Sequence, residues 1–288
     1  MNQVLADCHM HTCHSPDSQA NLFDMCLAAQ HKGASIVTIT DHCEMNLYYE
    51  RYQNVLEESQ SDTIETRKRF RDMKILLGIE MGQPLQDVVA SNEMLGDYRF
   101  DFVLASLHNP PKDCGYPLCK EKEENPDYVE AFENKDYAYL KYTKETTPII
   151  ITDYFERLYK MSLWGKFDSL SHITYPIRYC KGEQGVTVDI KQYYPIITEI
   201  YKALIQRDIA LELNSAGLRN PVHETAPNYE LLKLYKECGG KLITLGADAH
   251  TTAHVADGIP ECIEMLKSLD FDAYYYFERR RPVAVPIV

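Results

Sequence analysis

The chain has 288 residues and a formal net charge of −13, with 43 acidic against 30 basic side chains. Such an acidic surface repels phosphate backbones, so the composition argues against a general nucleic-acid-binding protein. Hydrophobic residues make up 45% of the chain, which is enough for the core of one large α/β domain or two ordinary ones. No stretch resembles a membrane span or a signal peptide. Nine irregularly spaced cysteines are typical of reduced thiols, and we therefore expect a cytoplasmic protein with no membrane partner.

Strand-like and helix-like segments alternate along the chain. The predicted strands span residues 4–6, 35–40, 74–79, 102–107, 167–172, 209–214 and 241–246. The predicted helices span residues 21–32, 54–73, 84–95, 192–206, 228–238 and 258–269, with two helical pieces between residues 135 and 163 that break near Thr147-Pro148. Because strands that alternate with helices pair in parallel, seven such units predict a closed or nearly closed barrel. No linker divides the chain, so we expect one α/β domain over residues 1–288.

Two segments fall outside this alternation. Residues 110–134 are rich in Pro, Lys, Glu and Cys, and we interpret them as an excursion over the strand ends, where barrel enzymes carry specificity loops. The tail, residues 273–288, begins with an aromatic strand-like patch. It either completes the barrel wall or mediates dimer contacts, and the oligomeric state stays open. The basic run Arg279-Arg280-Arg281 in this tail is expected to be solvated.

Histidines and carboxylates gather at the predicted strand ends. His9 and His11 lie two residues apart after the first strand, so their side chains point the same way and can hold one metal ion. Asp17 follows the Ser15-Pro16 turn and can fold back towards them. The carboxyl ends of parallel barrel strands converge on one face, which holds the active site. Taken together, the strand ends predict nine metal ligands: His9, His11, Asp17, His42, Glu80, His108, His172, Asp248 and His250.

Nine ligands are too many for one ion. Two or three divalent ions within about 4 Å of one another would use them, with Glu80 as the bridge because a carboxylate has two oxygens. Imidazole and carboxylate ligands suit zinc, iron or manganese. Such a cluster makes hydroxide from water near neutral pH and clamps the oxygens of a phosphoryl group. The natural chemistry is therefore hydrolysis of a phosphate ester.

The motifs resemble those of the PHP (polymerase and histidinol phosphatase) metal-dependent phosphoesterases, and nearly the full chain resembles their histidinol-phosphate phosphatase branch. The matching motifs are His9-x-His11 with Asp17, Thr40-Asp41-His42, Gly78-Ile79-Glu80, Ser106-Leu107-His108, Ser171-His172-Ile173-Thr174, Leu211-Glu212-Leu213-Asn214 and Gly246-x-Asp248-Ala249-His250. This resemblance implies a distorted (β/α)7 barrel with a trinuclear metal site.

The resemblance also implies how the ligands divide. One ion would take His9, His11, Glu80 and Asp248, a second Glu80, His108 and His172, and a third Asp17, His42 and His250. Some members of the family have a His where this chain has Asp17, so the third site is expected to be weaker or to select another metal.

Two arginines and an asparagine fit the same branch. Arg178 follows His172 by six residues and Arg219 lies just past the sixth strand. The guanidinium fork matches phosphate oxygens, so both are predicted to bind the substrate and stabilise charge during catalysis. Asn214, with Glu212, is expected to orient these groups or to contact the substrate. Either Asp248 or His250 is placed to protonate the leaving alkoxide, and the sequence leaves both open.

The function implied by the resemblance is hydrolysis of L-histidinol phosphate to L-histidinol and phosphate, in histidine biosynthesis. No local motif recognises the imidazole of that leaving group. Another phosphoesterase on the same fold, acting on nucleotides, nucleic acids or phosphotyrosine, is the nearest alternative. A non-catalytic metal-binding scaffold would be expected if ligands were missing, whereas here the set is complete.

Overall fold

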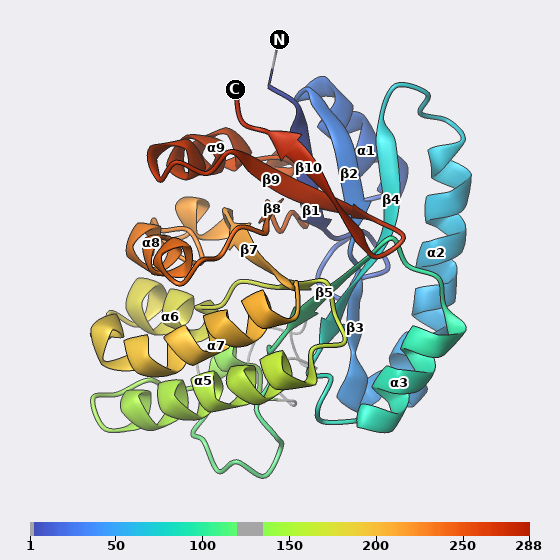
Figure 1. The fold of residues 1–288 in the computed structure, drawn as a ribbon. Helices are drawn as coiled ribbons and strands as arrows, with labels where there is room; N and C mark the ends of the chain where they lie inside the picture. Colours follow the sequence, from blue (N-terminus) through green and yellow to red (C-terminus); the bar gives the residue numbers. More distant parts are fainter. Residues whose placement is uncertain (1–2, 120–134) are drawn as a thin grey trace.

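Seven parallel strands form the wall of a barrel in the computed structural model, which describes residues 3–119 and 135–288 (Figure 1). In wall order they are β1 (Leu5–Met10), β2 (Ala34–Ile39), β4 (Lys74–Gly82), β5 (Phe102–Ser106), β6 (Ser169–Leu170), β7 (Ala210–Asn214) and β8 (Ile243–Gly246). A short strand, β3 (His42–Glu44), follows β2 after a break at Thr40-Asp41 and also pairs with β4.

The wall nearly closes on itself between its first and last strands. The His11 N–H donates to the Ala249 carbonyl at 2.9 Å, and the Asp248 N–H donates to the His9 carbonyl at 2.8 Å. These bonds join the end of β1 to the segment after β8. The predicted distorted (β/α)7 barrel is therefore confirmed, and the carboxyl ends of its strands meet on one face.

Helices surround the barrel on the outside (Figure 1). The longer ones are α1 (Leu22–His31), α2 (Gln53–Arg67), α3 (Val88–Asp97), α5 (Thr146–Trp164), α7 (Tyr194–Gln206), α8 (Tyr229–Glu237) and α9 (Ile259–Ser268). The starts of α1 and α8 are capped by side chains: that of Asn21 accepts a bond from the Phe23 N–H at 2.9 Å and that of Asn228 accepts from the Leu231 N–H at 3.2 Å. None of the helices in the described residues is long and apolar enough to cross a membrane.

Several predicted elements differ from the structure in their bounds, as the first strand does, which runs from Leu5 to Met10, and the helix predicted for residues 84–95, which spans Val88–Asp97. Three more differ as follows. The helix predicted for residues 54–73 ends at Arg67. The predicted break near Thr147-Pro148 is wrong, because α5 runs without interruption from Thr146 to Trp164. Pro148 lies in its first turn, where no backbone N–H is needed for the helix, so Pro is tolerated there. The fifth strand is reduced to Ser169–Leu170.

The predicted excursion over residues 110–134 is described only in part. Residues 110–119 form turns and an isolated bridge from Leu118 to Leu140. The remainder, residues 120–134, lies outside the described residues, so the excursion stays a prediction.

The tail forms an antiparallel hairpin of β9 (Ala273–Glu278) and β10 (Arg281–Pro286) that is separate from the barrel sheet. The Tyr274 hydroxyl donates to the Val4 carbonyl at 2.5 Å and accepts from the Ala6 N–H at 3.2 Å. At the other end of the hairpin, the Arg280 N–H donates to the Asp101 carbonyl at 2.9 Å. These partners lie at the amino ends of the strands, so the tail covers the barrel face opposite the predicted site. It does not complete the wall.

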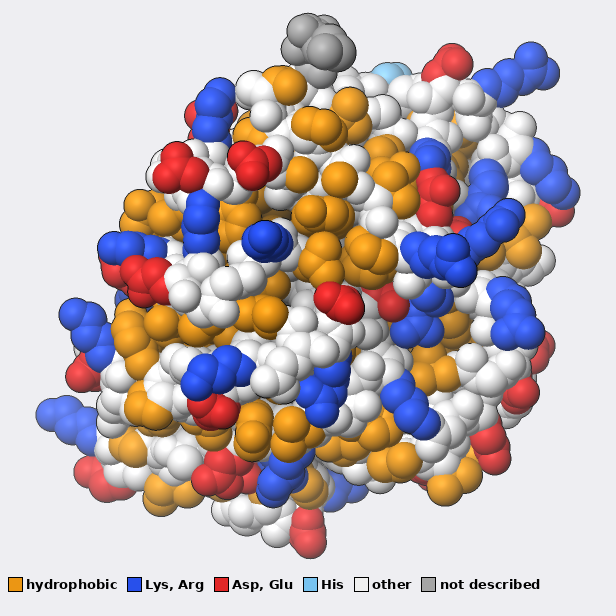
Figure 2. Space-filling model, in the orientation of Figure 1, with side chains coloured by type: hydrophobic (Ala, Val, Ile, Leu, Met, Phe, Trp, Pro, Cys, Tyr) orange, Lys and Arg blue, Asp and Glu red, His pale blue; other side chains and the backbone are white. Residues whose placement is uncertain are grey.

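The basic run in this hairpin is only partly solvated. Arg279 and Arg281 are exposed, whereas the half-buried Arg280 forms an ion pair with the buried carboxylate of Asp168. Basic and acidic side chains both occur on the face shown in Figure 2, with apolar side chains between them. The prediction of a fully solvated arginine run is therefore wrong for Arg280, because Asp168 needs a cationic partner where it is buried.

We expect the substitution Tyr274→Phe to lower the free energy of unfolding by about 1–3 kcal/mol, because it leaves the buried Ala6 N–H and Val4 carbonyl without their partner. Urea denaturation measures this change. The matched control is Tyr275→Phe, on the opposite face of the same strand, which should stay within about 0.5 kcal/mol of the unchanged protein. Equal stability of the two variants would show that the hairpin is not held through Tyr274.

Candidate metal centre

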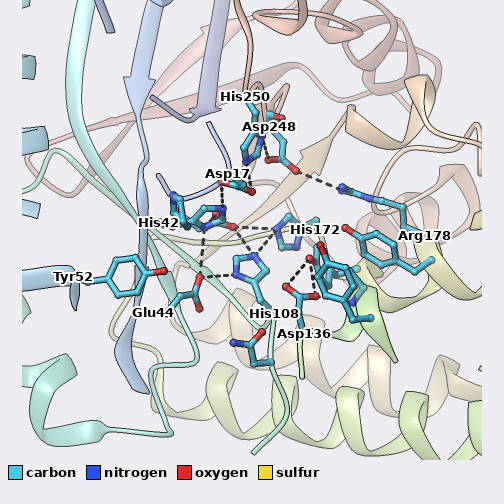
Figure 3. Close-up of a pocket in the computed structure, with 17 residues that line it drawn as sticks. Asp17, His42, Glu44, Tyr52, His108, Asp136, His172, Arg178, Asp248 and His250 are labelled. Atoms are coloured by element: carbon cyan, nitrogen blue, oxygen red, sulfur yellow. Dashed lines mark hydrogen bonds and ion pairs between the residues drawn. The ribbon is translucent and has the colours of Figure 1, made fainter. Parts of the chain in front are cut away.

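The barrel places the predicted ligands at the carboxyl ends of its strands. His9 lies in β1, and Glu80 lies in β4, two residues before that strand ends. His108, His172 and Asp248 each follow the last residue of their strand by two positions. Because these strand ends meet on one face, the structure brings all nine predicted ligands into one cluster. Figure 3 draws the ligands that line the cavity, among them Asp17, His108 and Asp248.

Four of these side chains form a first ligand set. The Nε2 atoms of His9 and His11 lie 3.0 Å apart. They lie 3.4 and 3.5 Å from Oε2 of Glu80, and 3.6 and 3.4 Å from Oδ1 of Asp248. Ligand atoms around a tetrahedral zinc ion lie about 3.3 Å apart, since each metal–ligand bond is about 2.0–2.1 Å. The spacing therefore fits a single four-coordinate cation.

The outer nitrogens of the same two rings support this assignment. Nδ1 of His9 lies 2.7 Å from a carboxylate oxygen of Glu212. Nδ1 of His11 lies 3.1 Å from the Ser15 hydroxyl, which donates to Asp41 at 2.8 Å and so accepts from the ring. Both Nδ1 atoms can therefore donate to these oxygens, and the two Nε2 atoms face each other. Burial opposes a charge on His9, but Glu212 and Glu80 outweigh burial and raise its pKa, so a proton lies between the two Nε2 atoms until a cation replaces it.

A second set shares Glu80 with the first. Oε1 of Glu80 lies 3.3 Å from Nε2 of His108 and 3.1 Å from Nε2 of His172, and the two nitrogens are 3.4 Å apart. The outer Nδ1 of His108 lies 2.9 Å from Oε1 of Glu44. One oxygen of Glu80 thus faces each set, which is the arrangement that a bridging carboxylate requires.

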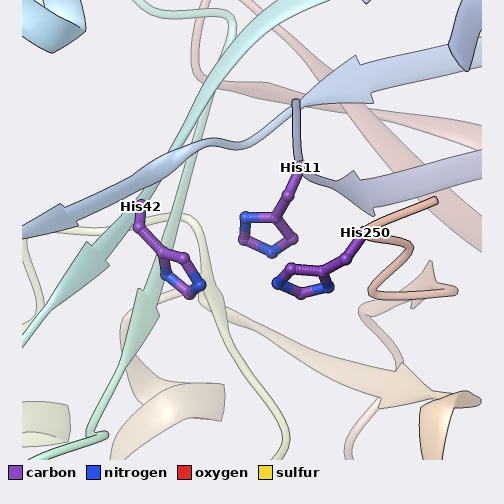
Figure 4. A group of neighbouring side chains, drawn as sticks. All are labelled: His11, His42 and His250. Carbon is purple, nitrogen blue, oxygen red and sulfur yellow. The ribbon is translucent and has the colours of Figure 1, made fainter. Parts of the chain in front are cut away.

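The third set, around Asp17, is looser. Its two oxygens lie 3.0 Å from Nε2 of His250 and 3.6 Å from Nε2 of His42. The rings of His42 and His250 flank His11, with centroid distances of 4.2 and 4.1 Å (Figure 4). Nδ1 of His42 also lies 2.9 Å from Oε2 of Glu80. Since the Asp17 side chain is 30% exposed, this set has the weakest enclosure of the three.

The pKa values of the clustered side chains are shifted by burial and by the charges of their neighbours. Burial raises the pKa of the Glu80 carboxyl, but the imidazoles of His9, His108 and His42 outweigh burial and hold that pKa well below its usual range. Burial, with His250 and His42 nearby, holds the pKa of His11 well below its usual range. A neutral imidazole is the form that binds a metal.

Without a bound cation, protons occupy nitrogen atoms of the predicted ligands. Burial opposes a charge on His108, yet Glu80 and Glu44 outweigh burial and raise its pKa to about 10. Because ligands must be deprotonated to bind, cations entering this cluster would release protons. The donor set and its spacing therefore fit divalent ions.

Acidic residues that the sequence analysis missed hold these ligands from behind. Glu44 accepts from His108 and from the side-chain amide of Gln83. Asp7 accepts from the backbone N–H groups of Ala247 at 2.9 Å and Ala256 at 2.8 Å, which fixes the turn after β8 against β1. Each of these acids stands within two positions of a predicted histidine, and that proximity was the signal available in the sequence.

Glu212 and Asn214 lie behind the ligands. Glu212 accepts from His9, from the Ser171 hydroxyl at 2.9 Å and from the His172 N–H at 2.9 Å. A Cβ at Gly246 would collide with the Glu212 carboxylate, so the close approach requires glycine. Asn214 is fully buried and its amide lies 3.1 Å from Glu212 and 3.4 Å from Oδ2 of Asp248. It orients these carboxylates and does not line the cavity.

The two arginines have different positions. Arg178 lines the cavity above the ligands, together with seven of the nine predicted ones, and its Nη2 lies 3.5 Å from Oδ2 of Asp248 (Figure 3). That nitrogen is buried and has no hydrogen-bond partner among the described residues. Arg219 instead donates to the carbonyls of Ala247 at 2.6 Å and Asp248 at 2.9 Å. It is not among the residues that line the cavity, but its Nη1 is buried without a hydrogen-bond partner among the described residues, so its predicted contact with the substrate stays a prediction.

The backbone of Asp248 explains what Arg219 does there. Asp248 has a φ of +53°, a left-handed conformation that is unfavourable for most residues and tolerated by Asp. The two bonds from Arg219 hold this turn, and the Asp248 N–H is fixed to β1. In this structure Arg219 therefore positions a ligand.

A family model, the PHP domain, matches residues 7–216, which is most of the chain. The chain belongs to the PHP family. The matched range includes seven of the nine predicted ligands, and the remaining two, Asp248 and His250, follow β8.

Relatives of this PHP chain extend over most of its length. A Clostridium acetobutylicum protein named a probable histidinol-phosphatase is 26% identical over 96% of this chain and 98% of its own length. The Lactococcus lactis histidinol-phosphatase is 26% identical over 85% of this chain and 83% of its own. A crystal structure of histidinol phosphate phosphatase from Lactococcus lactis, with zinc, L-histidinol and phosphate, superimposes with a TM-score of 0.72 at 24% identity, over 96% of this chain and 98% of that one. This likeness confirms the PHP-type barrel.

We expect Asp17→Asn to lower by one the number of ions retained after dialysis. The change removes the only carboxylate of the loosest set and leaves Glu80 and Asp248 in place. Elemental analysis of dialysed protein measures the stoichiometry. Asp24→Asn, at an exposed position of α1, is the matched control and should retain as many ions as the unchanged protein. If the Asp17 variant also retained as many, Asp17 would be excluded as a ligand.

Proposed function

We propose that this protein is a metal-dependent phosphomonoesterase that hydrolyses L-histidinol phosphate to L-histidinol and phosphate in histidine biosynthesis, in the cytoplasm. The observation that carries the phosphatase assignment is the buried Nη2 of Arg178, which has no hydrogen-bond partner among the described residues and lies on the wall of a cavity lined by predicted metal ligands. A guanidinium beside a divalent cluster suits a dianionic phosphoryl group. The names of the full-length relatives support histidinol phosphate as the substrate.

We assign two or three divalent ions, of zinc, manganese or iron, to the three ligand sets. His9, His11, Glu80 and Asp248 would hold one ion, and Glu80, His108 and His172 a second. Asp17, His42 and His250 would hold the third, with the loosest contacts. Ions bound there lower the pKa of bound water and neutralise charge on phosphoryl oxygens.

The residues of the chain supply the remaining parts of the reaction. Arg178 donates to the equatorial oxygens of the phosphoryl group, where negative charge is concentrated in the transition state. Arg219 and Asn214 act on the substrate indirectly, by holding Asp248. The attacking water forms a new bond to phosphorus in line with the ester oxygen, and the P–O bond to the alcohol breaks.

Proton transfer is assigned to Asp248. Its Oδ1 faces His9 and His11, while its Oδ2 faces Arg178 on the cavity side. Oδ2 can therefore take the proton that the attacking water loses and pass it to the leaving alkoxide, so that alcohol and phosphate are released. His250 is less suited, because its Nε2 faces Asp17 at 3.0 Å.

Phosphate release from L-histidinol phosphate, against a panel of nucleotides and phosphotyrosine, tests this function with zinc, manganese or iron supplied. We expect a large preference in kcat/KM for histidinol phosphate and loss of turnover with a chelator. His9→Ala should abolish turnover, because it removes a ligand and the partner of Glu212. Equal or better rates on nucleotides or phosphotyrosine would assign the protein to another PHP-type phosphoesterase.

Arg178→Ala should lower kcat/KM by about 100-fold, the size expected when one donor to a developing charge is lost. Arg157→Ala is the matched control, because Arg157 lies on α5, pairs with Asp153 there and is absent from the cavity wall. Metal content and far-ultraviolet circular dichroism should be unchanged in both variants. A decrease of less than threefold for Arg178→Ala would remove this residue from the phosphate site.

A further inference from the structure

A second charged group, which is not one of the predicted metal ligands, faces the cavity. Asp136 immediately precedes a short 3-10 turn, Tyr137–Tyr139, and its residue is only 9% exposed. Its Oδ1 accepts from the Ala138 N–H at 2.6 Å and from the Tyr175 hydroxyl at 3.1 Å, and its Oδ2 lies 3.3 Å from the same hydroxyl. Figure 3 shows this carboxylate on the cavity wall close to His108. Two donors thus fix its orientation.

Asp136 has no cationic partner of its own. Within residues 3–119 and 135–288, no Lys, Arg or His forms an ion pair with it. His108 is a charged neighbour on the cavity wall, but it pairs with Glu80 and Glu44. Arg178 lies over the Tyr175 ring, with its Cζ 5.6 Å from the ring centroid, and pairs with Asp248. Hydrogen bonds from neutral donors alone do not offset the full free-energy cost of removing a carboxylate from water. A positive group on a bound ligand would complete the compensation.

The cavity wall therefore carries groups of opposite preference. The ligand cluster and Arg178 attract an anion, and Asp136 attracts a cation. A phosphomonoester whose alcohol carries an amine has both charges. A phosphomonoester with a neutral alcohol satisfies only the first group.

We propose that Asp136, oriented by Tyr175 and the Ala138 N–H, binds the protonated amine of the leaving group and so selects phosphomonoesters of amino alcohols. This inference rests on the proposed function and adds a residue that sets its specificity. Tyr175 acts as a positioning residue, since its hydroxyl contacts Asp136. The phenol also shields the carboxylate from Arg178, which remains available to the phosphoryl group.

The test compares two esters and two proteins. L-Histidinol phosphate carries the amine, and 3-(imidazol-4-yl)propyl phosphate is the same ester without it. With the metal-loaded wild-type protein near neutral pH, we expect kcat/KM to favour the amine-bearing ester by roughly 10- to 100-fold, the range for a hydrogen bond to a charged group. Asp136→Asn keeps the shape and the acceptor for Ala138 but removes the charge. It should lose most of that preference, with less than threefold change on the ester without the amine.

Two controls separate this effect from loss of the fold or of general charge. Asp113→Asn removes one negative charge at an exposed position off the cavity wall and should keep the full preference. Tyr175→Phe should reduce the preference less than Asp136→Asn does, since Ala138 still orients the carboxylate. Metal content of every variant should match that of the wild type.

The outcomes distinguish the inference from the proposed function. If the wild type hydrolysed both esters equally well, the inference would fail and the phosphatase assignment would stand, whatever the variants did. An equal loss on both esters in Asp136→Asn would also overturn it, because Asp136 would then support the site as a whole. If the wild type hydrolysed neither ester, the proposed function itself would fail, and the inference with it.

Discussion

The carboxylate of Glu80 is the group on which the rest of the site depends. It is fully buried, and one or other of its oxygens lies within 3.5 Å of five imidazoles. A charge in this position would be prohibitively costly without partners. The barrel supplies them because β4 runs between β2 and β5 in the wall, so that Glu80 meets side chains from both sides. Its two oxygens then divide the ligands into two sets, and the third set builds on His42, which touches the same carboxylate.

Behind the ligands lies a second layer of acids, which gives the histidines their orientation. Glu212 fixes His9, Glu44 fixes His108, and Asp41 acts on His11 through Ser15. In each case the outer ring nitrogen is used, so the inner nitrogen is turned towards the centre, where a cation can replace its proton. The geometry of the cluster therefore does not rely on the ions alone. It is built into β1, β3, β7 and the connection after β2.

The sequence was sufficient for the barrel and for the convergence of the ligands because both depend on strand ends, which short apolar runs mark clearly. Elements whose position depends on tertiary contacts were predicted less well: Pro148 was taken as a break and is a helix start. Arg219 and Asn214 lie close to the site along the chain, yet only the fold shows that both point at Asp248 from behind. The supporting acids, such as Glu44, have no characteristic spacing in the sequence, since they contact residues that follow other strands.

The position of Asp136 could not be predicted from the sequence either, because this residue follows a segment without periodicity and lies at the cavity only in the folded chain. The charges around the cavity give a physical reason why an acidic protein can act on an anion that also carries an amine. The ligand cluster, filled with divalent ions, and Arg178 reverse the field locally, while the remaining acidity of the chain favours a substrate that also carries positive charge. The covered amino-terminal end of the barrel leaves the carboxyl-terminal face for entry. A substrate bound there with its phosphoryl group on the ligands must direct its alcohol towards the wall that carries Asp136.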